Sequence, residues 1–183
     1  SPRCLELDAP LYNIELLQWI DTEHCYTHAK YNDHFCIVAI DHDGMVYPLR
    51  FSPNADCMYP QKQGNELFYI ERNQYEQYRV MVTSYRDRTE EFDFLDRLAS
   101  YEKHKQEPCL IYDFGLSAVV FLTMVSSHEG FILEHPARVT KQDGVMQLIC
   151  HHLKEAEGKW SSERLFSMQV PTSLLFKGKE DRL

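Results

Sequence analysis

The segment 66–88 constrains the fold of this chain more than any other, because it determines whether a strand continues into a helix or turns back as a second strand. An apolar run at 67–71 is typical of a buried strand, and it ends in a polar corner at 71–74. The residues beyond the corner include good helix formers: Glu76, Gln77, Arg79 and Met81. Residues in the same stretch also alternate as a strand would: Tyr78, Val80, Val82 and Ser84. We predict a helix over 75–85 and keep the strand as the alternative.

The composition indicates a sheet-containing domain of ordinary size. The chain has 183 residues, of which 44% are hydrophobic, so a substantial core can be buried. Tyr and Phe number 11 and 10 whereas Gly numbers 7, which favours strands over a helical bundle. We therefore expect a single α+β domain over 1–183, with one mixed sheet and about three packed helices. A lead-in at 1–12 and a tail at 177–183 are expected to be flexible.

Hydrophobic periodicity predicts the remaining elements. Besides the ambiguous 75–85, helices are expected at 13–23, 89–105 and 143–157. Strands are expected at 34–40, 45–51, 67–71, 109–114, 118–125, 131–133, 165–170 and 174–176. The longest loop is expected at 52–65, which contains two prolines and a glycine.

The charge is acidic overall but locally basic. The formal net charge is -9, which excludes a grip on nucleic acid by a generally basic surface. Four arginines nevertheless fall close together: Arg72, Arg79, Arg86 and Arg88. A basic patch on an acidic body is therefore expected near the corner.

The cysteine pattern favours a reducing compartment. None of the six cysteines forms a C-x-x-C pair, and three of them lie in apolar stretches and are expected to be buried: Cys36, Cys109 and Cys150. The even count keeps a disulfide-bonded secreted protein as the alternative. The first residues have no signal-peptide apolar region, and no apolar run approaches the roughly 20 residues that span a membrane. We expect a cytoplasmic protein without membrane contact.

The corner predicts a phosphate site if a helix begins near Gln74. Backbone N–H groups at a helix N-terminus favour an anion, and Arg72 and Asn73 lie there. Arg79 and Arg86 are seven residues apart and would share one side of the helix, where guanidinium groups can bind phosphate oxygens. The alternative is an ordinary amphipathic helix with solvated arginines.

The sequence 69–79 resembles the strand–loop–helix at the centre of the ParB/sulfiredoxin fold. Members of that family use this corner to hold nucleotide or DNA phosphates. The chain lacks the Gly-Gly-Cys of sulfiredoxin, so the resemblance does not extend to sulfiredoxin chemistry. Matched by position, the resemblance implies a catalytic role for Glu71 and Arg72 and a phosphate-binding role for Arg79.

One branch of that fold consists of plasmid fertility-inhibition proteins of the oncogenic-suppression type, which the chain resembles in size. This resemblance implies ATP hydrolysis and DNA cleavage directed at DNA that leaves by a type IV secretion system during conjugation. ATP and Mg²⁺ would be the cofactors, and nucleotide and DNA the partners.

The turn at 41–44 offers a candidate metal site. Asp41 and Asp43 place two carboxylates at one hairpin tip, and oxygen ligands suit the Mg²⁺ that nuclease chemistry requires. The alternative is that the aspartates and Gly44 satisfy the backbone of a tight turn.

A second function class remains open beside the enzyme. An acidic domain without a catalytic motif also fits a non-enzymatic interaction module, such as an inhibitor or adaptor that binds a protein partner. The conformation of 75–85 separates the two, because a strand there would make the corner a plain turn and remove the predicted phosphate site.

Overall fold

The computed structural model describes residues 4–86, 93–136 and 144–173, and this part of the chain is mostly β. Twelve strands form three four-stranded antiparallel sheets, and the described residues contain a single α-helix. The predicted α+β domain with a mixed sheet and three helices is therefore wrong. The ParB/sulfiredoxin-like arrangement, which needs a helix after the corner, is wrong with it.

Sheet 1 contains the first four strands in chain order: β1 (Tyr12–Trp19), β2 (His24–Tyr31), β3 (His34–Asp41) and β4 (Val46–Arg50). Asn32 and Asp33 have φ of 49° and 68°, the left-handed pair that a two-residue hairpin turn requires between β2 and β3. The helix predicted at 13–23 is wrong, since β1 pairs antiparallel with β2 across most of that range. Ile14 and Leu17, which give this range its apolar spacing, are both exposed in β1.

Sheet 2 contains the next four strands: β5 (Ala55–Gln63), β6 (Glu66–Asn73), β7 (Tyr78–Ser84) and β8 (Cys109–Gly115). The predicted loop at 52–65 is largely β5, and the predicted helix at 75–85 is β7, so both predictions are wrong. β6 and β7 pair from Glu66 opposite Ser84 to Arg72 opposite Tyr78. The β-branched alternation at 80–83 therefore outweighs the helix formers, because pairing with β6 buries Val80 and Met81.

Helix α1 (Phe94–His104) lies between β7 and β8 in the chain and packs against β4. The Asp93 side chain caps it by accepting the Asp96 N–H at 2.8 Å. The helix predicted at 89–105 is confirmed over this span, while 89–92 lies outside the described residues. Phe94 is buried on this helix, whereas Leu95 is exposed. Within the described ranges, no helix is long and apolar enough to cross a membrane.

Sheet 3 contains the last four strands: β9 (Ala118–Ser126), β10 (Glu129–His135), β11 (Val145–Ala156) and β12 (Lys159–Pro171). The helix predicted at 143–157 is wrong, because β11 and β12 form one long hairpin. Glu157 and Gly158 close it with φ of 56° and 78°. The strand predicted at 174–176 lies outside the described residues.

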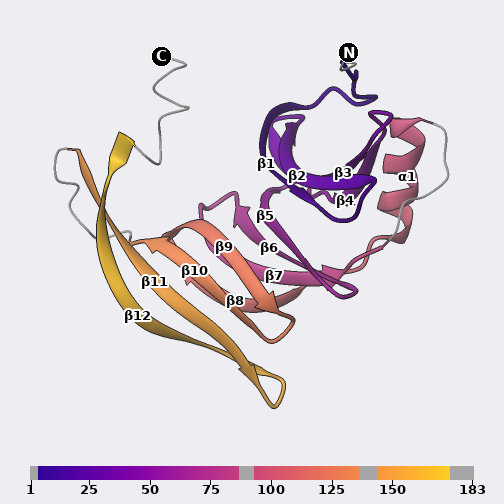
Figure 1. Ribbon diagram of the computed structural model, residues 1–183. Coiled ribbons are helices and arrows are strands. Elements are labelled where there is room, and N and C mark those ends of the chain that lie inside the picture. The colour runs from indigo at the N-terminus through magenta and orange to yellow at the C-terminus, as the bar shows by residue number, and fades with distance from the viewer. Residues whose placement is uncertain (1–3, 87–92, 137–143, 174–183) are drawn as a thin grey trace.

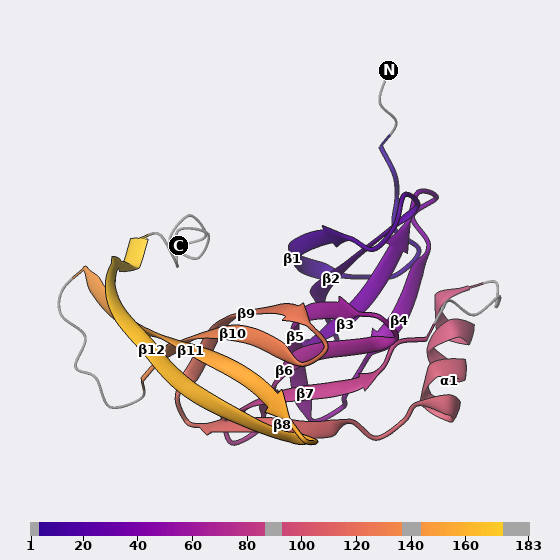
Figure 2. The same cartoon turned by 60° about the horizontal axis from the view of Figure 1, so that its bottom comes forward.

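The three sheets lie in series, with sheet 2 between the other two, as both views show (Figures 1 and 2). β5 joins them, since it packs against β2 and β3 of sheet 1 and against β9 of sheet 3. Side-chain hydrogen bonds from β5 reach both neighbours: Asp56 accepts the Phe35 N–H at 2.8 Å, and Gln61 accepts the Met124 N–H at 3.2 Å. A left-handed residue within the strand, Tyr59 with φ of 55°, bends it between these contacts.

All six cysteines are free thiols. Cys36 and Cys150 are buried as predicted, but the prediction for Cys109 is wrong, because this thiol is exposed. Cys109 begins β8, which is the edge strand of sheet 2, so little of the chain covers it.

Candidate functional site

The corner at 71–74 is the start of a hairpin loop between β6 and β7. The Asn73 side-chain oxygen accepts the Tyr75 N–H at 2.9 Å and the Gln77 N–H at 3.1 Å. The Asn73 carbonyl also accepts the Glu76 N–H at 3.0 Å. Asn73 thus accepts hydrogen bonds from N–H groups that lie in the predicted helix. Local hydrogen bonds of this kind are how Asn competes with helix formation. The loop N–H groups are therefore not available as an anion site at a helix N-terminus.

Arg72 is held by an ion pair between two strands. Its guanidinium donates to one carboxylate oxygen of Asp56 at 2.6 and 3.0 Å, and to the Tyr78 hydroxyl at 3.3 Å. Burial acts to raise the pKa of Asp56, but the Phe35 N–H and Arg72 outweigh it and hold the pKa below its usual range. Arg72 therefore has a structural partner on β5 instead of an open phosphate site.

The other predicted phosphate-binding residues do not converge with Arg72. Arg79 pairs with Asp113 on β8 at 3.3 Å, and Glu71 lies opposite Arg79 in the β6–β7 pairing. Arg86 lies beyond the far end of β7, at the rim of a separate pocket. Catalytic roles for Glu71 and Arg72 stay predictions, and no shared site of these side chains supports them.

The carboxylate of Asp41, one of the two predicted metal ligands, is hydrogen-bonded within its own hairpin. One Asp41 oxygen accepts the N–H groups of Asp43 and Met45, and the other accepts the Tyr47 hydroxyl at 3.2 Å. Both oxygens of this buried carboxylate are thus used by the turn, which agrees with the alternative interpretation. Among the described residues, no group of three or more His, Cys, Asp or Glu side chains is arranged to hold a metal ion.

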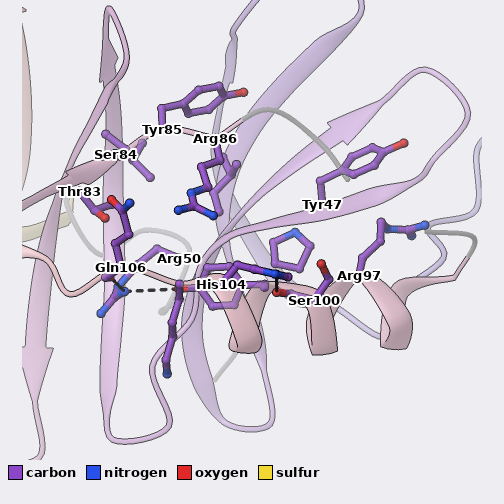
Figure 3. Close-up of a pocket in the computed structure, with 15 residues that line it drawn as sticks. Tyr47, Arg50, Thr83, Ser84, Tyr85, Arg86, Arg97, Ser100, His104 and Gln106 are labelled. Atoms are coloured by element: carbon purple, nitrogen blue, oxygen red, sulfur yellow. Dashed lines mark hydrogen bonds between the residues drawn. The ribbon is translucent and has the colours of Figure 1, made fainter. Parts of the chain in front are cut away.

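A pocket of about 120 Å³ lies between β4, the end of β7 and the second half of α1 (Figure 3). Basic side chains reach it from three segments: Arg50 from β4, Arg86 from the end of β7, and Arg97, His104 and Lys105 from α1 and its C-terminal end. Its walls also include the apolar or aromatic side chains of Tyr47, Leu49, Leu67, Tyr85 and Tyr101. None of the described residues that line it is acidic, which is notable in a chain of net charge -9.

Two of these arginines are buried, with different partners. Arg97 is 0% exposed, forms an ion pair with Asp8, and donates from Nε to the Val46 carbonyl at 2.9 Å. Arg50 is 8% exposed, and its hydrogen bonds go to neutral oxygens, those of the Tyr101 hydroxyl at 3.4 Å and the Gln106 carbonyl at 3.3 Å. Figure 3 shows the second bond as a dashed line.

A second candidate surface is the outer edge of β1. We call Ile14, Leu16, Leu17 and Trp19 the β1 patch; all four are exposed, with Leu17 at 61% and Trp19 at 75%. β1 is the edge strand of sheet 1, and in the described part of the chain no strand pairs with its outer side. A large apolar set on an open sheet edge is the usual form of a site for another polypeptide.

Sequence reasoning missed both surfaces for identifiable reasons. The segment that contains the β1 patch was predicted to be a helix, although its aromatic and branched residues also favour a strand. The pocket has no local signal, since Arg50 and Tyr101 meet only after folding.

Comparison of the chain with protein-family models, with curated proteins and with solved structures finds no match in any of the three. The resemblance to ParB/sulfiredoxin proteins therefore rests on the sequence 69–79 alone, and that segment forms a hairpin here.

Proposed function

We propose that the protein is a non-enzymatic interaction module that binds a basic protein partner along the edge strand β1. The observation that carries this proposal is the exposure of the β1 patch on an unpaired sheet edge. The internal ion pairs of Arg72 and Arg79 favour this class over the predicted nucleotide hydrolase and nuclease.

The β1 patch has the chemistry of a binding hot spot. Trp is among the residues most enriched in such hot spots, and Trp19 leaves most of its surface to solvent. Isolated exposed apolar residues are normal, but four within six consecutive positions of one strand form a concentrated patch. A partner that covers them gains apolar burial.

The backbone of β1 explains why these side chains are exposed. Asn13 and Leu16 have φ of 50° and 54°, and the pairing with β2 shifts on either side of Glu15. Each shift is a bulge, which reverses the faces to which the following side chains point. Leu16 and Leu17 are both exposed, whereas strict alternation would place them on opposite faces of the sheet.

The charge around β1 defines the partner. Three exposed carboxylates lie beside the patch, Glu15 within β1 and Asp21 and Glu23 in the turn that follows it. Carboxylates beside an apolar patch are complementary to a partner with an apolar strand flanked by Lys or Arg. Such a partner can add a strand to the open edge and insert its side chains against the β1 patch.

The test requires a purified partner. Proteins captured from the source cells by the wild-type protein are first identified without regard to the β1 patch, and the main one is purified so that its Kd for the wild-type protein can be measured. We expect Trp19→Ala to weaken that Kd at least about 30-fold, the effect of losing a hot-spot residue worth about 2 kcal/mol. We also expect a Glu15→Gln, Asp21→Asn variant to slow association and reduce its dependence on salt.

Phe166→Ala is the matched control, because Phe166 is also exposed on an edge strand, β12. It should leave the Kd unchanged. The proposal is wrong if Trp19→Ala and Phe166→Ala bind equally well, or if the patch only joins two copies of the chain in light-scattering measurements. The same preparations, incubated with ATP or with plasmid DNA and Mg²⁺, test the predicted enzyme; activity that Arg72→Ala removes would favour the enzyme over the module.

A further inference from the structure

We propose that the pocket between β4, the end of β7 and α1 binds a small organic anion, with its carboxylate or phosphate group against Arg50 and Arg86. The inference is independent of partner binding at β1, because it concerns a different surface built from different residues.

The unusual state of Arg50 carries the inference. Guanidinium groups stay charged in proteins, and a buried charge is normally paired with an opposite one. Arg50 is more than nine-tenths buried, and no carboxylate pairs with it in the part of the chain that the structure describes. Its two hydrogen bonds are long, and its Nε has no hydrogen-bond partner.

The ionisable groups beside Arg50 do not supply the missing charge. Burial raises the pKa of the Tyr69 and Tyr101 hydroxyls, and it raises the pKa of the Cys57 thiol to about 12. All three are therefore neutral at physiological pH. The guanidinium lies 5.9 Å from the centre of the Tyr69 ring, which provides a weak cation–π contact but no counter-charge.

The remaining basic residues show where an anion fits. Arg97 already has the carboxylate of Asp8, and Lys105 has that of Glu102 at 3.0 Å, so these two charges are offset. Arg86 is an exposed guanidinium on the pocket wall, and it approaches from a different element than Arg50 (Figure 3). Two arginines that line one pocket, with no acidic residue among its described lining residues, favour an oxyanion.

The size and walls of the pocket define the rest of the ligand. Its volume is about 120 Å³, whereas a closed apolar cavity of about 150 Å³ accommodates a benzene ring. The lining includes Leu49, Tyr85 and Tyr101, whose apolar and aromatic surfaces can pack against a ring or a short chain. The expected ligand is therefore a compact molecule with one oxyanion and one apolar or aromatic part.

Calorimetric titration with four probes tests this inference: benzoate, phenyl phosphate, inorganic phosphate and the neutral benzyl alcohol. We expect benzoate or phenyl phosphate to bind and to raise the melting temperature of the protein. The probe that binds more tightly shows whether the site prefers a carboxylate or a phosphate group. Inorganic phosphate should bind more weakly, because it lacks the apolar part. Benzyl alcohol should bind at least about 10-fold more weakly, because it makes no charge-assisted hydrogen bond.

Substitutions locate the site. Arg50→Met should weaken anion binding by about 10- to 100-fold, as expected for a charge-assisted contact, and Arg86→Gln should weaken it to a smaller extent. Arg86 is exposed, so its substitution tests the pocket even if Arg50→Met does not fold. Arg79→Gln is the matched control, since it removes an arginine of β7 that does not line the pocket, and should leave binding unchanged.

Three results would overturn the inference. One is the absence of anion binding to the wild-type protein up to about 10 mM. Another is equal binding of benzyl alcohol and the anions. The third is anion binding that Arg86→Gln leaves unchanged, or that Arg79→Gln weakens as much as Arg86→Gln does.

Discussion

At the scale of single residues, the two buried arginines near α1 show how much a partner changes the role of one residue type. Arg97 bonds to the Asp8 carboxylate and the Val46 carbonyl, and thereby ties the segment before β1, β4 and α1 together. Within the described residues, Arg50 bonds to neutral oxygens, and it lines a pocket. We infer that Arg97 stabilises the fold, whereas Arg50 binds a ligand.

The stability of two variants tests this difference. Asp8→Ala should lower the free energy of unfolding by about 3 kcal/mol, because it leaves a fully buried guanidinium without its carboxylate. Arg50→Met, measured without added anion, should change it by less than about 1 kcal/mol, because it removes a buried charge that lacks a counter-charge. Urea unfolding measures both values. A larger loss for Arg50→Met than for Asp8→Ala would contradict the assignment.

His28 makes stability depend on pH. Burial lowers its pKa, an effect that the nearby Glu15 carboxylate only partly opposes, and its Nδ1 accepts the Tyr59 N–H at 3.1 Å. The native state therefore keeps His28 neutral below the pH at which the unfolded chain, with a pKa of about 6.5, takes up a proton. Since the unfolded state binds more protons there, stability falls as pH decreases below about 6.5.

Urea unfolding between pH 7.5 and 5 measures this dependence. His28→Gln should remove part of the slope, by at most about 1.4 kcal/mol per pH unit, the effect of one proton. His42→Gln is the control, because His42 lies exposed in the β3–β4 turn. Equal slopes for the wild type and His28→Gln would show that His28 titrates alike in both states.

At the scale of elements, the sequence predicted strands better than it predicted helices. Apolar β-branched runs such as 34–40 and 118–125 form strands as expected, because burial in a sheet and local preference agree there. Tyr12–Trp19 and Val145–Ala156 fall largely within segments of helix-like spacing but form strands, because hairpin pairing satisfies their backbones. Long-range pairing of this kind leaves little local trace in a sequence.

The phosphate site predicted at 71–74 depended on a helix that does not form, for a local reason that Asn73 illustrates. Asn73 was predicted to face a phosphate, but its side chain closes the hairpin loop. Asn is favoured in turns because its side chain can bond to the nearby backbone in this way. The sequence therefore contained a turn signal at Asn73, which we interpreted as a phosphate contact. The ion pairs of Arg72 and Arg79, in contrast, involve residues far away in the sequence and could not be predicted from it.

The bulged backbone of β1 leads to a prediction about the element itself. Leu16 has φ of 54°, a conformation that costs a side-chain-bearing residue roughly 1–2 kcal/mol and that glycine adopts freely. Leu16→Gly should therefore raise the free energy of unfolding by about 1 kcal/mol, because the exposed side chain contributes little packing. Leu17→Gly is the control and should lower it by about 0.5–1 kcal/mol, as glycine does within a strand. Destabilisation by Leu16→Gly in urea unfolding would contradict the left-handed bulge.

At the scale of the whole molecule, β5 connects the three sheets. Its side chains bond to β3 through Asp56, to β1 through Gln61, and to β9 through Gln61 and Gln63. The sequence assigned this segment to a loop, because its prolines and polar residues are typical of loops. Those polar residues are instead needed for contacts to both neighbouring sheets, which explains why composition gave the wrong element here.

The arrangement of sheets also separates the two proposed sites. The β1 patch lies at the free edge of sheet 1, and the pocket lies between β4 at the other edge of that sheet, the end of β7 and α1. A partner at β1 and an anion in the pocket can therefore bind at the same time. The structure gives each site its own set of variants, so the two can be tested separately.

Hydrogen exchange of the protein with and without its purified partner tests the central claim most directly. If the partner adds to the open edge of β1, amide protection should increase mainly within Tyr12–Trp19, because outward N–H groups gain hydrogen bonds. Increased protection at Glu66–Asn73 and in the loop after it, with none at β1, would contradict partner binding at β1. It would instead indicate binding at the corner where the phosphate site was predicted.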